Sequence, residues 1–449
     1  MAAKAIFVGG TTSHAGKSWM ATAICAHLKR RGLRVAPFKA QNMSNNSYVA
    51  GNGGEIGRAQ AAQAEACGLE PHTDMNPILL KPHSDQGSQV VLHGRVWRDL
   101  SATAYYDHFD WLLEQVLEAY RRLAARFDYI VIEGAGSVAE VNLASRDLVN
   151  FGLARRIGAP ALLVADINRG GVFASLIGTL QLLEEEDRRL VRSFAVNRFR
   201  GDLSLFTDGV EFLERKMDRP CLGVFPYARD IRLAAEDGVS LEEMEPSLGN
   251  IAAIGFPHIS NVTDLDRLRP EWVFAPVQKL FTHVILPGTK NTEGDLDWLK
   301  RQRLDLWVKR QHAAGARIIG VCGGYQMLGR FVDGQPGLDL LPVNTVMLPE
   351  KTVKRVRATT PGGSDFEAYE IHMGETGRAA EPFAWIEGNP EGSCGNNVFG
   401  TYLHGALESE HVCRELGLEV HQKSGSEYDK LADWFENTAD LELFGRLYL

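Results

Sequence analysis

Residues 5–18 read Ala5-Ile-Phe-Val-Gly-Gly-Thr-Thr-Ser-His-Ala-Gly-Lys-Ser18. This apolar run breaks into glycines and ends in a Lys-Ser pair just before apolar residues at helical spacing, so it predicts a strand, a phosphate-binding loop and a helix. In such a loop, backbone N–H groups hold phosphate oxygens, the lysine adds a positive charge and the serine hydroxyl faces a magnesium ion. We therefore expect ATP to bind at Gly10, Thr11, Thr12, Ser13, Gly16, Lys17 and Ser18.

Further apolar segments of strand length alternate with helical segments through the first half of the chain. The strand segments cover residues 33–38, 129–132, 161–165, 193–196 and 221–225. Strands that alternate with helices predict an α/β fold in which helices cover both faces of a parallel sheet. Ligands of such sheets bind beyond the carboxyl ends of the strands, so the residues that follow each strand are candidates for a site.

Polar residues follow four of these strands, at 39–47, 133–136, 166–171 and 197–202. At a single strand end, turn chemistry explains such residues as well as function does, because Asn, Asp, Ser and Gly are common turn residues. Four polar strand ends on the same side as a phosphate loop favour one shared site. Because Mg²⁺ prefers oxygen ligands, we expect the Ser18 hydroxyl to hold it, with Asp166 as a candidate carboxylate.

The phosphate loop has an unusual spacing. Five residues separate Gly10 from Gly16, whereas the common nucleotide-binding motif has four. A bare Gly-Lys-Ser occurs often by chance, but its position between a strand and a helix strengthens the signal. The spacing resembles that of the dethiobiotin synthetase group of ATP-dependent, carboxylate-activating enzymes. That group places a Glu-Gly-x-Gly at a strand end to help hold magnesium. Glu133-Gly-Ala-Gly136 resembles this element, and the resemblance implies that Glu133 is a magnesium ligand.

The chain length allows two or three domains. Residues 228–249 are acidic and irregular, and a new series of strands and helices begins at 250–256. We therefore predict an ATP-dependent synthetase domain over residues 1–230, a linker over 231–249 and a second α/β domain over 250–449.

Composition excludes several classes of protein. The net charge of −9 argues against binding to nucleic acid through general electrostatics. The six cysteines form no Cys-x-x-Cys pair and no dense framework, so we expect reduced cysteines without disulfides or zinc. No leader and no apolar stretch near the ~20 residues of a membrane span are evident, which predicts a cytoplasmic protein that has no membrane partner. The segment Asn261-Val-Thr263 matches the acceptor pattern for N-glycosylation, and in a cytoplasmic protein this match is due to chance.

A second chemical site is predicted around Cys322. The segment Ala316-Arg-Ile-Ile-Gly-Val-Cys-Gly-Gly-Tyr-Gln-Met-Leu-Gly329 runs from a strand through glycines into a helix, which is typical of a nucleophile elbow. The glycines permit a strained turn, and the helix N-terminus favours the thiolate. The alternative is a buried structural cysteine, which is the more common fate of cysteine in an apolar stretch. The flanking glycines argue against it.

A thiol that attacks an amide needs a base and an oxyanion hole. The segment 287–291 follows a strand and offers the backbone N–H groups of Gly288 and Thr289, together with that of Gly323. For the base, His404 lies at the end of the predicted strand 397–403 and is the best placed of the 13 histidines. One strand-end histidine alone is more often structural, so the assignment depends on Cys322 as its partner.

The motifs of both halves together resemble the glutamine-hydrolysing cobyric acid synthase family, a cobalamin-pathway branch of the class I glutamine amidotransferases. In the second half these are Gly320-Val-Cys-Gly-Gly-Tyr-Gln, Pro287-Gly-Thr-Lys-Asn and Tyr402-Leu-His-Gly. The first half adds Lys39-Ala-Gln-Asn-Met-Ser, Gly54-Glu-Ile-Gly-Arg-Ala-Gln, Asp74-Met-Asn-Pro-Ile-Leu-Leu-Lys-Pro82, Asp166-Ile-Asn-Arg-Gly-Gly and Phe199-Arg-Gly-Asp202. The ordered matches cover nearly the whole chain.

The resemblance implies a flavodoxin-like amidotransferase domain behind the synthetase domain. It also implies ATP- and Mg²⁺-dependent amidation of the b, d, e and g carboxylates of adenosylcobyrinic acid a,c-diamide, with glutamine as the ammonia donor. Such a corrinoid is a polyanion that needs cationic and polar partners. The candidates for that role are Lys39, Gln41, Asn42, Arg58, Lys81 and Arg169.

Several alternatives stay open at this point. The sister enzyme that amidates the a and c acetates shares both domain types, and a non-catalytic regulatory ATPase with a phosphate loop is a rival from another class. Many class I amidotransferases place an acid two residues after the histidine, but His404-Gly-Ala406 has none, as in the cobalamin-pathway branch. The group that orients His404 is therefore open, with Glu370 as one candidate. Oligomeric state is not predicted.

Overall fold

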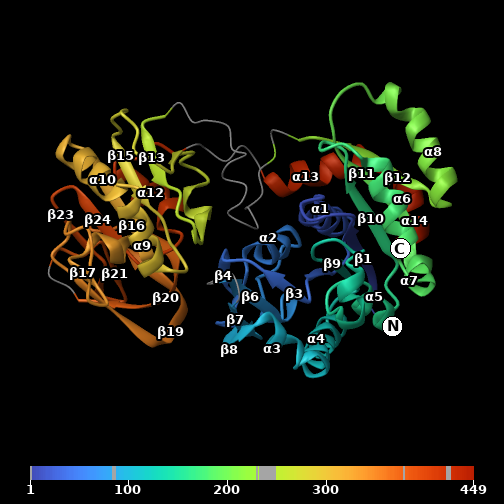
Figure 1. Cartoon of the computed structure of the whole chain (residues 1–449), viewed down its shortest axis with the longest axis horizontal. Helices are drawn as coiled ribbons and strands as arrows, with labels where there is room; N and C mark the ends of the chain where they lie inside the picture. The colour runs from blue at the N-terminus through green and yellow to red at the C-terminus, as the bar shows by residue number, and fades with distance from the viewer. Residues whose placement is uncertain (1–2, 83–86, 229–230, 232–248, 378–379, 421–425) are drawn as a thin grey trace.

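The computed structural model describes residues 3–82, 87–228, 231, 249–377, 380–420 and 426–449. Figure 1 shows two α/β parts, each built around its own sheet. The predicted fold class, a parallel-sheet domain with a phosphate loop followed by a second α/β domain, is confirmed. The predicted linker 231–249 lies outside the described residues except for Ile231 and Gly249.

The first sheet has six parallel strands in the order β12-β11-β10-β1-β9-β2. Their bounds are β1 Lys4–Gly10, β2 Val35–Phe38, β9 Tyr129–Glu133, β10 Ala161–Asp166, β11 Val191–Phe199 and β12 Cys221–Pro226. The strand register pairs Val8 with Glu133 and Gly10 with Val164. The loop after β1 therefore leaves the sheet at the same edge as Glu133 and Asp166, as the sequence predicts.

Helices cover both faces of this sheet. On one face, Ile6 and Val8 of β1 pack in a buried cluster with Met20 and Ile24 of α1, whereas Phe7 points to the other face. The helices of this half are α1 Lys17–Arg30, α2 Arg58–Ala66, α3 Ala102–Tyr106, α4 Phe109–Ala124, α5 Phe151–Ile157, α6 Val172–Leu182, α7 Glu185–Leu190 and α8 Thr207–Met217. Strands buried on both faces explain the continuous apolar runs in the sequence.

Between β2 and α3 the chain forms two small sheets that the sequence does not predict. A four-stranded sheet has the order β3-β6-β7-β8, and β4 pairs with β5. Their bounds are β3 Gln41–Met43, β4 Ser47–Val49, β5 Glu55–Gly57, β6 Ile78–Pro82, β7 Gly87–Leu92 and β8 Arg95–Ser101. The polar stretch 39–47 after β2 is thus partly strand, held in two separate ladders.

The second half centres on a sheet with the order β14-β13-β15-β16-β24-β23, parallel except at β23. A further sheet has the order β18-β17-β19-β21-β22, with β20 on β19. The strands are β13 Ile251–Ile254, β14 Glu271–Val273, β15 His283–Leu286, β16 Arg317–Val321, β17 Phe331–Val332, β18 Gln335–Pro336, β19 Asn344–Thr359, β20 Asp365–Thr376, β21 Ala384–Ile386, β22 Asn389–Glu391, β23 Ser393–Gly395 and β24 Val398–Thr401. The helices are α9 Thr292–Arg301, α10 Leu304–Ala313, α11 Gly323–Leu328 and α12 Glu410–Glu415.

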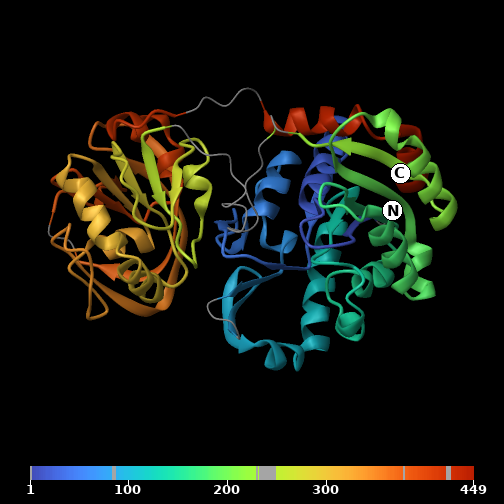
Figure 2. The same cartoon turned by 45° about the horizontal axis from the view of Figure 1, so that its top comes forward.

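The last two helices return to the first half of the molecule, which differs from the predicted second domain over 250–449. They are α13 Glu427–Glu436 and α14 Leu441–Tyr448. Figure 1 and Figure 2 show α13 beside α1, and Phe444 of α14 contacts the ring of His27 of α1. Phe435 and Phe444 are buried with Leu28 of α1, and each such side chain stabilises the contact by roughly 1.5–3 kcal/mol. Arg30 of α1 pairs with Glu436 at 2.9 Å. The other predicted boundaries stay predictions.

None of the helices in the described part of the chain combines the length and the apolar character needed to cross a bilayer.

Candidate active sites

The phosphate loop has the geometry that the sequence predicts. Gly16 precedes α1 in the left-handed region, with φ 93°. A Cβ at this position would lie 2.0 Å from the Asn197 amide nitrogen, which donates to the Ala15 carbonyl at 3.0 Å. Only glycine fits both the left-handed backbone and the close approach of the Asn197 amide. The Lys17 ammonium crosses the loop and donates to the carbonyls of Gly136 at 2.8 Å and Thr12 at 3.3 Å.

Ser18 and Glu133 come together at the end of the sheet. The Ser18 hydroxyl donates to the Glu133 carboxylate at 2.7 Å, and Lys39 and Gln63 donate to the same carboxylate at 2.8 Å and 2.5 Å. Glu133 is fully buried. A hydroxyl and a carboxylate beside a phosphate loop fit Mg²⁺, which takes oxygen ligands and phosphate oxygens together.

Asp166 has different partners. Its carboxylate accepts from Arg198 at 3.1 Å and from the backbone N–H of Asn168 at 2.7 Å. Arg198 follows the next strand of the sheet, β11, so this carboxylate is already neutralised by a cation. Its predicted role as a magnesium ligand stays a prediction.

The predicted corrinoid-binding residues do not form one exposed cationic surface. Lys39, Arg58 and Lys81 are each paired with a glutamate, namely Glu133 at 2.8 Å, Glu65 at 2.9 Å and Glu55 at 2.5 Å. Two polar candidates have side-chain partners within the same half: Gln41 accepts from Tyr105, and Asn42 donates to Gln60. Arg169 is exposed on the loop after β10. The positive charges of Lys39, Arg58 and Lys81 are therefore largely balanced by protein carboxylates.

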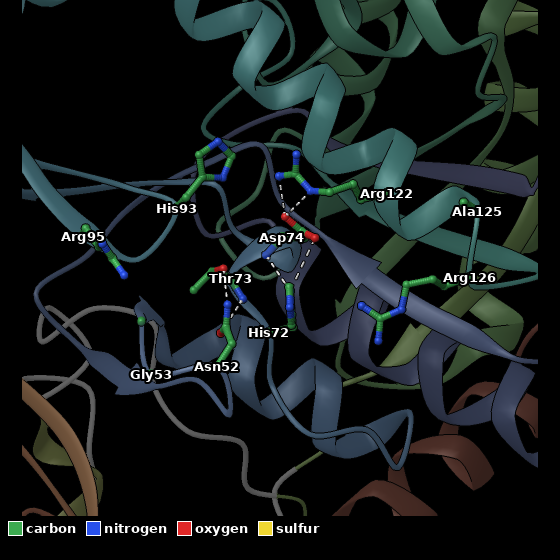
Figure 3. Close-up of a pocket in the computed structure, with 11 residues that line it drawn as sticks. Asn52, Gly53, His72, Thr73, Asp74, His93, Arg95, Arg122, Ala125 and Arg126 are labelled. Carbon is green, nitrogen blue, oxygen red and sulfur yellow. Dashed lines mark hydrogen bonds and ion pairs between the residues drawn. The ribbon is translucent and has the colours of Figure 1, made fainter.

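A cationic pocket of about 630 Å³ lies beyond β2, between the β7–β8 hairpin and the C-terminal end of α4 (Figure 3). Its lining includes three arginines, two histidines and one carboxylate: Arg95, Arg122, Arg126, His72, His93 and Asp74. Arg122 donates to Asp74 twice, at 2.6 Å and 3.0 Å. Within the described residues, Arg95 and Arg126 make no ion pair. The pocket therefore carries an excess of two positive charges. The sequence did not predict this pocket.

In the second half, Cys322 lies on a strained turn between β16 and α11. Its φ of 52° and ψ of −112° are unfavourable for a residue with a side chain. A Cβ at Gly324 would lie 1.9 Å from the Leu286 carbonyl, so glycine permits the turn to pack against β15. The elbow predicted from the glycines is present. Cys322 is buried, as the alternative of a structural cysteine also requires, but a structural role does not explain the backbone strain.

His404 lies beside Cys322, and Asp264 orients it. The Nδ1 atom of His404 lies 2.8 Å from the Asp264 carboxylate, whose other oxygen accepts the Gly405 N–H. Burial by itself lowers the pKa of His404, but the hydrogen bonds with Asp264 and with the Cys322 sulfur outweigh it and raise that pKa to about 10. Asp264 and Cys322 therefore favour the imidazolium form of His404, whose charge stabilises a neighbouring thiolate.

Asp264 was missed by sequence reasoning, which suggested Glu370 for this role. Glu370 instead pairs with Lys354 at 2.8 Å and His372 at 3.4 Å. Burial raises the pKa of Glu370, but these two partners lower it further than burial raises it. Its neighbour Tyr369 stacks on the His404 ring with centroids 5.3 Å apart. Glu370 is thus near the site and is not the group that orients His404.

The predicted oxyanion-hole residues surround the same cysteine and histidine. A Cβ at Gly323 would lie 3.2 Å from the backbone nitrogen of Thr289, and one at Gly288 would lie 3.1 Å from Cε1 of His404. The structure therefore brings these loops together around Cys322. The use of these N–H groups to bind an oxyanion stays a prediction.

The two halves meet through buried polar contacts. Glu55 of the first half binds Lys81 and, across the interface, Lys351, each at 2.5 Å. Burial raises the pKa of Glu55, but the two ammonium groups outweigh burial and hold that pKa far below its usual range. Lys290, next to the predicted oxyanion loop, donates to Gln89 of the first half at 3.0 Å. Breaking a buried ion pair by removing one partner costs roughly 3–5 kcal/mol, so this contact fixes how the halves face each other.

Comparison with known proteins gives two family matches. Residues 6–241 match the CobQ/CobB/MinD/ParA nucleotide binding domain, and residues 250–412 match the CobB/CobQ-like glutamine amidotransferase domain. A solved structure titled "Crystal structure of glutamine amidotransferase" is 16% identical, covering 41% of this chain and 100% of its own, with a TM-score of 0.32. The first family match spans more than half of the 449 residues.

Proposed function

Because the chain belongs to the CobQ/CobB/MinD/ParA nucleotide-binding family and continues into a CobB/CobQ-like glutamine amidotransferase domain, we propose that it is a glutamine-dependent cobyric acid synthase. It amidates the b, d, e and g carboxylates of adenosylcobyrinic acid a,c-diamide with ATP and glutamine. The observation that carries the proposal is the presence in one chain of a Cys322–His404–Asp264 triad and a phosphate loop backed by Glu133.

In the glutaminase half, the Cys322 thiolate attacks the side-chain amide carbon of glutamine. The N–H groups of Gly288, Thr289 and Gly323 stabilise the oxyanion that forms. The His404 imidazolium gives its proton to the departing nitrogen, so ammonia leaves and a thioester remains. Water, deprotonated by the now neutral His404, attacks the thioester and releases glutamate. Asp264 holds the imidazole in the tautomer that these steps need.

In the synthetase half, a carboxylate is a poor electrophile and must first be activated. The acceptor carboxylate takes the γ-phosphoryl group of ATP, which yields an acyl phosphate and ADP. Ammonia then displaces phosphate to give the amide. Lys17 and the loop N–H groups hold the phosphate oxygens. Ser18 and Glu133 would hold Mg²⁺, which neutralises phosphate charge during transfer.

An amide count tests the assignment. Given adenosylcobyrinic acid a,c-diamide, ATP and glutamine, the protein is expected to add four amides, followed as products by mass spectrometry. Cobyrinic acid, whose a and c acetates are free, should not be amidated at those two positions. Amidation confined to a and c would instead establish the sister activity. Absence of ammonia release and of amidation with every corrinoid would favour the non-catalytic ATPase.

The cationic pocket of Figure 3 supports a polyanionic acceptor. Residues 73–76 link its lining to Lys39, because the Lys39 N–H donates to the Met75 carbonyl at 2.9 Å and Asn76 donates to the Lys39 carbonyl at 3.1 Å. We propose that Arg95 and Arg126 bind carboxylates of the acceptor that are not under reaction. This role replaces the one predicted for Lys39, Arg58 and Lys81, whose charges are paired with glutamates.

The double variant Arg95→Gln, Arg126→Gln is expected to raise the acceptor KM about tenfold, the equivalent of roughly 1.4 kcal/mol. The KM for glutamine and kcat at saturating acceptor should change little, because neither arginine touches the reacting atoms. Initial rates at varied corrinoid concentration measure the effect. Arg98→Gln is the matched control, since Arg98 lies on the same hairpin but stacks over Trp97. An unchanged acceptor KM in the double variant would contradict this role.

A further inference from the structure

Asn261 occupies an unusual position beside the triad. It is buried and in the left-handed region, with φ 55° and ψ 48°, which Asn tolerates better than most residues. It caps the short 3₁₀ turn Val262–Leu265 that carries Asp264. The same residue therefore sets the start of the turn that delivers the triad carboxylate.

The side chain of Asn261 faces the reactive side of His404. Its Nδ2 atom lies 3.4 Å from Nε2 of His404, whereas Asp264 binds the opposite ring nitrogen. The Asn261 amide nitrogen is only a donor, so it can bond Nε2 when the imidazole is neutral but not when Nε2 carries a proton. In this arrangement, Asn261 opposes the protonated state of His404 that the thiolate pair requires.

The orientation of this amide is fixed from the synthetase half. Oδ1 of Asn261 accepts the backbone N–H of Ser47 at 2.8 Å, and the Asn261 backbone N–H donates to Oδ1 of Asn46 at 2.7 Å. Because the Ser47 N–H binds Oδ1 of Asn261, the Nδ2 atom of the same amide faces His404. Without the Ser47 contact, the amide could turn and present its oxygen to a protonated Nε2.

Asn46 and Ser47 belong to the segment that starts at the nucleotide site. Lys39 at its beginning holds Glu133, which also accepts the Ser18 hydroxyl. Between Lys39 and Asn46, the segment is held by the pairing of β3 with β6 and by the hydrogen bond from the Ser44 N–H to the Leu80 carbonyl. A chain of direct contacts thus runs from the predicted ATP and magnesium site to the base of the glutaminase.

We propose that Asn261 couples the two reactions by reporting the state of the segment 39–47 to His404. In the observed state, Ser47 orients the Asn261 amide so that glutamine hydrolysis is restrained. Binding of nucleotide and acceptor at the synthetase site shifts the segment, releases the amide and activates the glutaminase. This coupling rests on the proposed function, because it needs an acceptor whose binding is sensed. Asn261 is a positioning residue and takes no proton itself.

The variant Asn261→Gly tests the proposal, because glycine keeps the left-handed backbone and removes only the amide. Glutamine hydrolysis without ATP and corrinoid is expected to rise about 5-fold or more, the range of ordinary coupling between sites. The glutamate formed per amide should rise above the value for the unchanged protein. Amidation driven by ammonium salt should stay the same. Asn46→Ala, on the synthetase side, should shift both readouts in the same direction.

Arg355→Gln is the matched control. Arg355 also crosses the interface, to Glu70 at 2.5 Å and to the Tyr48 hydroxyl at 3.1 Å, but has no contact with Asn261. Its variant should keep acceptor-dependent hydrolysis. If Asn261→Gly hydrolyses glutamine only when ATP and corrinoid are present, as the unchanged protein does, the proposal is overturned. If the unchanged protein itself does not amidate the corrinoid, the proposed function fails first.

Discussion

Replacing Cys322 with alanine is expected to abolish glutamine-dependent amidation while amidation from ammonium salt persists. Removing the nucleophile of a triad lowers the rate on the order of 10³-fold or more, because no other group forms the covalent intermediate. The predicted ATP site lies at the ends of β1, β9 and β10, whereas Cys322 follows β16 of a different sheet. Glutamate release and amide formation, measured with glutamine and then with ammonium chloride, separate the two reactions.

Cys413→Ala provides the control for this experiment. Cys413 is another buried cysteine of the same half, and its sulfur contacts only the Leu407 carbonyl among the polar groups of the described residues. It should keep both activities. Unchanged ammonia release by Cys322→Ala would remove the glutaminase assignment. Loss of amidation from both nitrogen sources would contradict two separate sites in one chain.

Local sequence signals predicted the phosphate loop and the turn at Cys322 because each depends on a short continuous stretch. The loop ending in Lys17-Ser18 and the elbow at Cys322 require glycines at fixed positions, and the structure shows why: a Cβ at Gly16 or Gly324 would clash with Asn197 or the Leu286 carbonyl. The strand ends of a parallel sheet converge by geometry, so Glu133 could be placed beside the loop before any coordinates.

Pairing between distant residues could not be predicted in the same way. Lys39 and Glu133 are 94 residues apart, and Lys351 meets Glu55 across 296 residues. A sequence shows that a lysine is present but not whether a carboxylate neutralises it. The structure pairs three of the cations assigned to the corrinoid with glutamates, and it contains a pocket with Arg95 and Arg126 that the sequence did not predict. The docking of α13 and α14 on α1 is another long-range contact of this kind.

Asp264 was missed for a different reason. The pattern of many class I amidotransferases places the orienting acid two residues after the histidine, whereas Asp264 lies 140 residues before His404. Asn261-Val-Thr-Asp264 lies beyond the carboxyl end of that strand, where the same rule identified Glu133 in the first half. In the sequence, this stretch resembles a glycosylation acceptor. The geometric rule for strand ends marks Asn261 and Asp264 in the second sheet as it marks Glu133 in the first.

Asp264→Asn is expected to lower glutamine hydrolysis on the order of 10²–10⁴-fold, the range found when a triad aspartate is made neutral. One oxygen of Asp264 is held by the Gly405 N–H, so the new amide nitrogen would face Nδ1 of His404. The imidazole would then have to accept at Nδ1 and carry its proton on Nε2. A neutral ring in that tautomer cannot take a proton from Cys322 or from water.

The pH dependence gives an independent readout of the same change. The pKa of His404 is raised to about 10, so the imidazolium persists through neutral pH and is lost only as the pH rises through that value. The stability gained from its charge pair with Asp264 is fully present below the ordinary histidine pKa of about 6.5 and disappears over the same rise. Without the carboxylate, that pKa falls, so the descending limb of the glutaminase profile should move toward neutral pH.

Glu370→Gln is the matched carboxylate-to-amide control, because Glu370 lies on the strand next to His404 but binds Lys354 and His372. Its pH profile should keep the position of the unchanged protein. Amidation from ammonium salt should be unaffected in both variants, which shows that the fold is intact. If Asp264→Asn hydrolyses glutamine within a few-fold of the unchanged rate and with the same descending limb, Asp264 does not orient His404, and the dyad of Cys322 and His404 acts without a third member.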